Sequence, residues 1–104
     1  MIVSEEDISI INEEQNMEDT SNLFLLLGNV TRIKIIYALR NENKTVSDLA
    51  HITNCSQSLI SKQLKILRDK DIVDFKQKSK YRQYYLTDKN IISALNELVI
   101  NMLI

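Results

Sequence analysis

With 104 residues, the chain suffices for one domain with a modest core, and its single cysteine excludes an internal disulfide and a cysteine-rich metal cluster. One glycine, no proline and 44% hydrophobic residues favour long helices, while the apolar runs are too short to span a membrane. Residues 1–19 contain seven acids and no base, so residues 20–104 carry a net charge of +6. We therefore expect a cytoplasmic, mainly helical protein with a basic folded part.

The acidic N-terminal segment, residues 1–17, is predicted to be an arm or a short helix outside a main domain that spans residues 18–104. Ser4 precedes three acids, as in a helix N-cap and first turn, and Ile8 and Ile11 lie on one side. We interpret the charge run as a solvated helix face. The alternative is a weak electrostatic brake on nucleic acid binding.

Two helices are predicted next. Residues 23–27 form a dense apolar face that ends at Gly28-Asn29, in the manner of a C-terminal cap, and Asn29 or Thr31 can begin the following helix. That helix, roughly residues 30–40, is expected to turn Val30, Ile33, Ile36, Tyr37 and Leu39 inward and Arg32, Lys34 and Arg40 outward.

Residues 45–70 have the spacing of a helix-turn-helix. Ser47 is expected to cap the first helix, and Asn54 is expected to end it in a left-handed conformation. Ser56 suits the N-cap of the second helix, which should stop near Lys70.

The second helix of this motif has two faces of different chemistry. Ile60, Leu64 and Leu67 form one apolar stripe that should pin the helix to a core. The opposite face carries hydroxyls, amides and cations, which are the groups that read base edges and phosphates in a major groove. Its residues are Gln57, Ser58, Ser61, Lys62 and Lys65.

A hairpin and a last helix complete the predicted order. Residues 72–76 and 81–86 are rich in β-branched and aromatic side chains and flank the polar segment 77–80. Thr87-Asp88 is expected to cap the last helix, whose apolar stripe is too wide for a small monomer to bury. We therefore expect a homodimer, with an interface formed by Leu23, Leu26, Leu27, Ile91, Leu95, Leu98 and Met102.

The order of four helices, a two-stranded wing and a final helix is that of a winged helix-turn-helix domain, mainly α with a small β-hairpin. Within it, residues 27–35 (LGNVTRIKI) and residues 56–67 (SQSLISKQLKIL) resemble two characteristic segments of the ArsR/SmtB family of bacterial repressors. Two positions depart from the family pattern: Gln63 stands where histidine is usual, and Lys78-Ser79-Lys80 stands where the wing normally has a glycine.

The resemblance implies a homodimeric, sequence-specific transcriptional regulator, most simply a repressor. Its dimers would form through the first and last helices, and two recognition helices would enter successive major grooves of a pseudo-palindromic operator. Phosphate contacts would supply salt-dependent affinity, whereas Gln57, Ser58, Ser61 and Lys62 are the candidates for base contacts. The predicted DNA-binding residues are Gln57, Ser58, Ser61, Lys62, Lys65, Lys76, Lys78, Lys80 and Arg82. The alternative is that these cations only keep a surface soluble.

The metal-ligand positions of the family are nearly empty in this sequence, so no metal or other cofactor is expected. Its Cys-x-Cys opening falls on Thr45 and Ser47, which offer no thiolate. The positions of its last-helix site are taken by Asp88, Asn90, Asn101 and Ile104.

The remaining chemistry-bearing residues are expected to be structural. Cys55 falls at a turn position where the family usually has an apolar residue, so a buried, inert thiol is expected. The alternative, a single-thiol oxidation switch, requires an exposed Cys55. His51 should be a partly exposed helix residue. The four tyrosines, Tyr37, Tyr81, Tyr84 and Tyr85, are expected to pack in the core and wing.

Two rival functions remain at this point. The first is a winged helix used for protein contact, which a salt-dependent shift of random DNA would distinguish from a DNA-binding regulator. The second is an enzyme, which the chain does not favour because it shows neither a recognisable nucleophile-base motif nor a glycine-rich phosphate loop. The sequence does not identify an effector.

Overall fold

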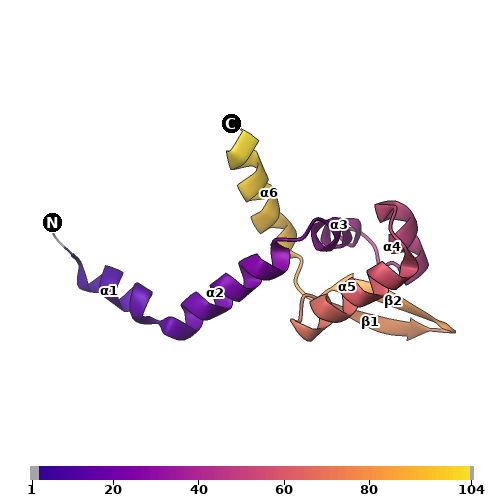
Figure 1. Ribbon diagram of the computed structural model, residues 1–104, viewed down its shortest axis with the longest axis horizontal. Helices are drawn as coiled ribbons and strands as arrows, with labels where there is room; N and C mark the ends of the chain where they lie inside the picture. Colours follow the sequence, from indigo (N-terminus) through magenta and orange to yellow (C-terminus); the bar gives the residue numbers. More distant parts are fainter. Residues whose placement is uncertain (1–2, 104) are drawn as a thin grey trace.

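The computed structural model describes the backbone of residues 3–103 and the side chains of residues 3–99. The order predicted for residues 18–104 is confirmed, with one more helix before it (Figure 1). The elements are α1 (Glu5–Asn12), α2 (Glu14–Leu27), α3 (Val30–Ala38), α4 (Val46–Thr53), α5 (Gln57–Asp69), β1 (Val73–Lys78), β2 (Tyr81–Leu86) and α6 (Asn90–Leu103). No helix in the described residues is long and apolar enough to cross a membrane.

The core lies among α3, α4, α5 and the hairpin. The predicted apolar stripe of α5 is confirmed, because Ile60, Leu64 and Leu67 are fully buried. Ile36 of α3 and Leu49 of α4 are equally inaccessible and belong to the same cluster. This packing fixes which side of α5 remains exposed.

Helix α2, with α1 beyond it, and helix α6 project from this core in different directions (Figure 1). Among the described side chains, α2 contributes Leu26 to the buried core and α6 contributes Leu95. The radius of gyration is 16.9 Å, whereas a compact chain of this length would have about 13 Å. The projecting helices therefore expose much of their surface in a single chain.

Several local predictions about α3 and α4 are confirmed and others are wrong. Asn29 caps α3 by accepting from the backbone N–H of Arg32, and Asn54 ends α4 with φ of 56°. The cap of α4 is Thr45 rather than Ser47, because Thr45 and Asp48 form a reciprocal capping box. Val30 is 70% exposed instead of buried, since it lies on the opposite side of the helix from Leu39.

The hairpin turn is shorter than predicted. Gln77 and Lys78 lie within β1, and Lys78 pairs with Tyr81, which leaves a two-residue loop of Ser79 and Lys80. Ser79 has φ of 56°, so it adopts the left-handed conformation that glycine usually provides. The wing therefore forms with serine in the strained position.

Candidate nucleic-acid interface

The helix-turn-helix is held by hydrogen bonds within and around its turn. The backbone N–H of Cys55 donates to Ala50 O at 3.1 Å, and Ser56 Oγ accepts from the backbone N–H of Leu59 at 3.1 Å. Ser56 is therefore the N-cap of α5, as the sequence predicts. These bonds fix the direction in which α5 leaves the turn.

The exposed side of α5 carries all five of the polar residues selected from the sequence. Its apolar stripe is buried on the opposite side, so the polar residues cannot turn inward without breaking the core packing. Leu59, 37% exposed, is the one large apolar side chain that lies among them. The exposed residues are Gln57, Ser58, Ser61, Lys62 and Lys65.

A hydrogen bond that the sequence analysis missed holds α5 to α3. Gln63 is buried, and its Oε1 accepts from Arg32 Nε at 2.8 Å. Arg32 was expected to point outward, but it is half-buried and also donates to Leu26 O at 3.1 Å. The sequence contains one sign of this bond, because Gln63 is a polar residue in the apolar stripe, three positions after Ile60, and a buried polar side chain needs a hydrogen-bond partner.

The wing places an aromatic ring beside two guanidinium groups. The Cζ atoms of Arg68 and Arg82 lie 4.5 Å and 4.2 Å from the ring centroid of Phe75. Arg68 Nε also donates to Asp74 Oδ1 at 3.0 Å. The pKa of Asp74 is lowered, first because the backbone N–H of Phe75 donates to its carboxylate and then because of Arg68. Arg82 is thus positioned by the wing itself.

Other wing side chains divide between packing and exposure. Lys76, Lys78 and Lys80 are exposed. Tyr84 is buried, whereas Tyr81 is 58% exposed, so the prediction that all the tyrosines pack is wrong for Tyr81. Tyr37 and Tyr85 are half-buried.

One cavity brings the start of α4, the start of α5 and the wing together. Its volume is about 410 Å³, and its lining includes Gln57, Lys80 and Arg82 from the predicted DNA-binding set. Thr45 and Ser47 line the same cavity. The structure therefore gathers part of the predicted set around one concavity, while Lys62 and Lys65 lie farther along α5.

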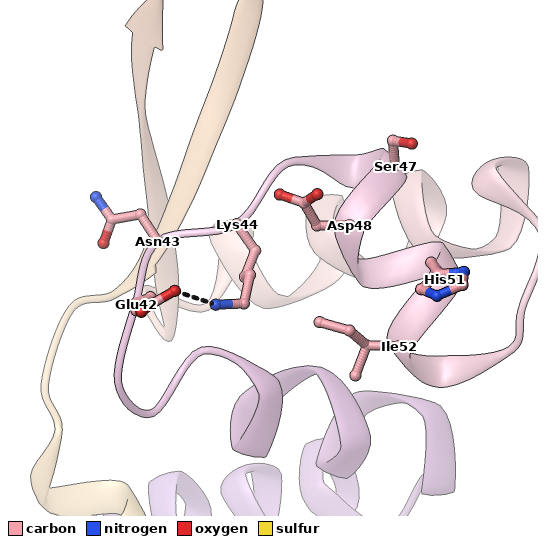
Figure 2. Close-up of a pocket in the computed structure, with 7 residues that line it drawn as sticks. All are labelled: Glu42, Asn43, Lys44, Ser47, Asp48, His51 and Ile52. Atoms are coloured by element: carbon pink, nitrogen blue, oxygen red, sulfur yellow. Dashed lines mark hydrogen bonds and ion pairs between the residues drawn. The ribbon is translucent and has the colours of Figure 1, made fainter.

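A second cavity, of about 510 Å³, lies between α4 and the loop that precedes it (Figure 2). Lys44 Nζ pairs with Glu42 Oε2 at 3.1 Å, and Asp48 Oδ2 accepts from the backbone N–H of Thr45 at 3.0 Å. That backbone hydrogen bond is the largest cause of the lowered pKa of Asp48. His51 is exposed, as expected. The acids of this cavity are thus already bonded within the protein.

Cys55 is half-buried rather than buried, because it packs at the margin of the core with its Sγ 3.5 Å from Thr53 O. In the described residues no group of three His, Cys, Asp or Glu side chains is placed to hold a metal ion. Of the last-helix metal positions, the side chain of Asn101 and all of Ile104 lie outside the described residues. The expectation that metal is not bound stays a prediction.

The proposed dimer surface is an apolar groove of about 400 Å³ between α2 and α6. Leu23, Phe24 and Leu98 line it and are exposed. Leu26 and Leu95 are buried within the single chain, and Leu95 also lines this groove, so their part in a dimer interface stays a prediction. Leu27 and Ile91 are half-buried at the groove, and the side chain of Met102 lies outside the described residues.

Comparisons with known proteins agree with this architecture. The family described as "Bacterial regulatory protein, arsR family" matches residues 29–74. The arsenical resistance operon repressor of Bacillus subtilis (strain 168) is 35% identical over 75 residues, which cover 71% of each chain.

Two solved structures are similar to the whole fold. The transcriptional regulator HlyU from Vibrio vulnificus CMCP6 is 27% identical with a TM-score of 0.75, and the match covers 86% of this chain and 97% of that one. A homodimeric winged helix-turn-helix domain from Mycobacterium bovis is 16% identical with a TM-score of 0.73, and the match covers 97% of this chain and 90% of that one. The sequence match to the repressor and the shared winged helix fold show that the chain belongs to the arsR family of bacterial regulatory proteins.

Proposed function

We propose that the protein is a cytoplasmic, homodimeric transcriptional repressor that binds a pseudo-palindromic DNA operator through α5 and the wing. The observation that carries this proposal is the exposed polar face of α5, which is fixed in orientation by the buried stripe and by the Arg32–Gln63 hydrogen bond. Cations on the wing, Lys76, Lys78, Lys80 and Arg82, would contact phosphates beside the base-reading residues.

The homodimer is supported by the apolar groove between α2 and α6. Burial of such a surface contributes about 25 cal/mol per Å², whereas an exposed apolar patch promotes aggregation. Exposed Leu23, Phe24 and Leu98 make the groove a suitable contact for a second copy. A two-fold dimer presents two α5 helices, and for this reason we infer that the operator is pseudo-palindromic.

Residues 1–17 are proposed to be an arm on a DNA-binding domain of residues 18–104, joined to it through α2, which begins at Glu14. The rival function is a protein-interaction module that does not bind DNA. A salt titration with random duplex DNA separates the two. We expect binding that weakens steeply as salt rises, whereas the absence of binding at low salt would favour the rival.

A further inference from the structure

Helix α1 has an apolar side that no described part of its own chain covers. All of its described side chains are exposed, and Ile8 and Ile11 are 48% and 67% accessible. The helix is properly capped, since Ser4 Oγ accepts from the backbone N–H of Asp7 at 3.0 Å. A helix of eight residues is marginally stable by itself in water, so a contact with another surface would stabilise it.

Helix α2 separates α1 from the core of its own chain (Figure 1). Glu13 joins the two helices, and α2 then continues for 14 residues, a length of about 21 Å. Figure 1 shows that α2 carries α1 away from α3, α4 and α5. In a dimer that uses α2 and α6, the arm would therefore extend along the second copy.

A groove beside α4 is lined by both apolar and cationic side chains, which suit the apolar and acidic residues of α1. It lies between α3 and α4, has a volume of about 310 Å³, and includes the apolar side chains of Ile33, Ala38 and Ile52. Ile52 is 53% exposed although it is a large aliphatic residue. The side chains of Lys34 and Arg40 are exposed and line the same groove.

The two surfaces are complementary in both polarity and charge. The first turn of α1 contains three acids and is followed by its isoleucines, and the groove is lined by two cations as well as by Ile52. We propose that α1 of one protomer docks in the α3–α4 groove of its partner. This inference rests on the homodimer proposed above. It leaves the exposed face of α5 open, because that face does not line the groove.

Cross-linking between two different full-length chains tests this contact. Both chains carry Cys55→Ser, one also carries Ile11→Cys, and the other also carries Ile52→Cys. After mixing and exchange of subunits, a short bismaleimide should join Ile11→Cys of one chain to Ile52→Cys of the other. This reaction should be at least several times faster than the joining of Ile11→Cys to Lys78→Cys in a parallel mixture. The control position is an exposed residue of the wing.

Each other outcome overturns the docking. Faster reaction with Lys78→Cys would place the acidic arm on the DNA-binding surface, and equal rates would show an arm without a fixed site. Sedimentation of the same samples separates the two proposals. A dimer without preferential cross-linking contradicts only the docking, whereas a monomer contradicts the proposed dimer as well.

A charge substitution provides a second readout. Lys34→Glu should lower the rate of Ile11–Ile52 cross-linking by about threefold, because it places a like charge beside the acidic first turn of α1. Lys70→Glu, at an exposed residue outside the groove, is the control and should leave the rate unchanged. Equal effects of the two substitutions would contradict a specific site.

Discussion

Arg32 and Gln63 connect three helices through one hydrogen-bonded group. Arg32 Nε donates to Gln63 Oε1 on α5 at 2.8 Å, and its Nη1 donates to Leu26 O on α2 at 3.1 Å. Arg32 itself lies in the first turn of α3. The group therefore fixes the proposed recognition helix relative to the helix that leads to the proposed dimer interface.

Loss of the Gln63 amide should destabilise the protein. Gln63→Leu removes the acceptor and leaves the half-buried guanidinium of Arg32 without this partner, so we expect a loss of about 1–3 kcal/mol in the free energy of unfolding. Gln63→His is the matched control, because a ring nitrogen can still accept, and it should cost less. Urea unfolding measures both. Equal stability of Gln63→Leu and the parent chain would contradict this role.

Features that depend on short-range sequence patterns could be predicted. The exposed and buried faces of α5 follow from a repeat of apolar residues, and the Ser56 cap and Asn54 terminator follow from the preferences of single residues. The Arg32–Gln63 bond joins positions 31 residues apart, and periodicity within one helix carries no information about such a contact.

The wing could likewise be predicted only in part from the sequence. Strand-forming residues predicted a hairpin, but the packing of Arg68 and Arg82 against Phe75 depends on the strand register and on where α5 ends. The division of α2 and α6 between core and dimer surface is a related case, because Leu26 and Leu95 are buried within one chain. An apolar helix face does not reveal which of its residues pack within one chain and which remain for a partner.

Glycine should be preferred to serine at the tip of the wing. Ser79 adopts φ of 56°, where a side chain other than glycine is strained. Ser79→Gly should relieve this strain and, after the added flexibility of the unfolded chain is subtracted, raise stability by about 0.5–1 kcal/mol. Thermal unfolding measures the change. Lower stability would show that the serine side chain makes a favourable contact that outweighs the strain.

The capping box of α4 should make stability depend on pH in the acid range. The pKa of Asp48 lies below its ordinary value of 3.8 in the folded protein, chiefly because the Thr45 backbone N–H donates to the carboxylate. The folded state consequently binds fewer protons than the unfolded state. The contribution of the Asp48 carboxylate to the free energy of unfolding is therefore present above the ordinary pKa and is lost as pH falls through the pKa of the folded protein.

Asp48→Asn removes the titrating group but keeps an acceptor oxygen. The variant should lose less stability than the parent chain between about pH 6 and about pH 3, measured by urea unfolding. Identical pH profiles for the two proteins would contradict a folding contribution from the Asp48 carboxylate.

Metals are not expected to release the protein from DNA through either of the two metal sites that the family resemblance implies, at Thr45 and Ser47 or at Asp88, Asn90, Asn101 and Ile104. Thr45 and Ser47 offer only hydroxyl oxygens, and Thr45 Oγ1 already accepts from the Asp48 backbone N–H at 3.1 Å. An effector shifts an equilibrium only through different affinities for the two states. Titration with zinc, cadmium, nickel or arsenite should leave DNA binding unchanged. Release that is abolished by combined His51→Ala and Cys55→Ser would instead make these two residues the sensor.

We propose that the polar face of α5 reads base sequence, whereas Lys65 and the wing cations contact phosphates. The most direct measurement compares binding of variants to a genomic fragment retained by the protein and to random duplex DNA, each over a range of salt. Lys65→Ala should weaken both and reduce the salt slope by about 1, whereas Ser61→Ala should cost about 1–3 kcal/mol mainly on the retained fragment. Equal losses on both DNAs for both variants would contradict the account.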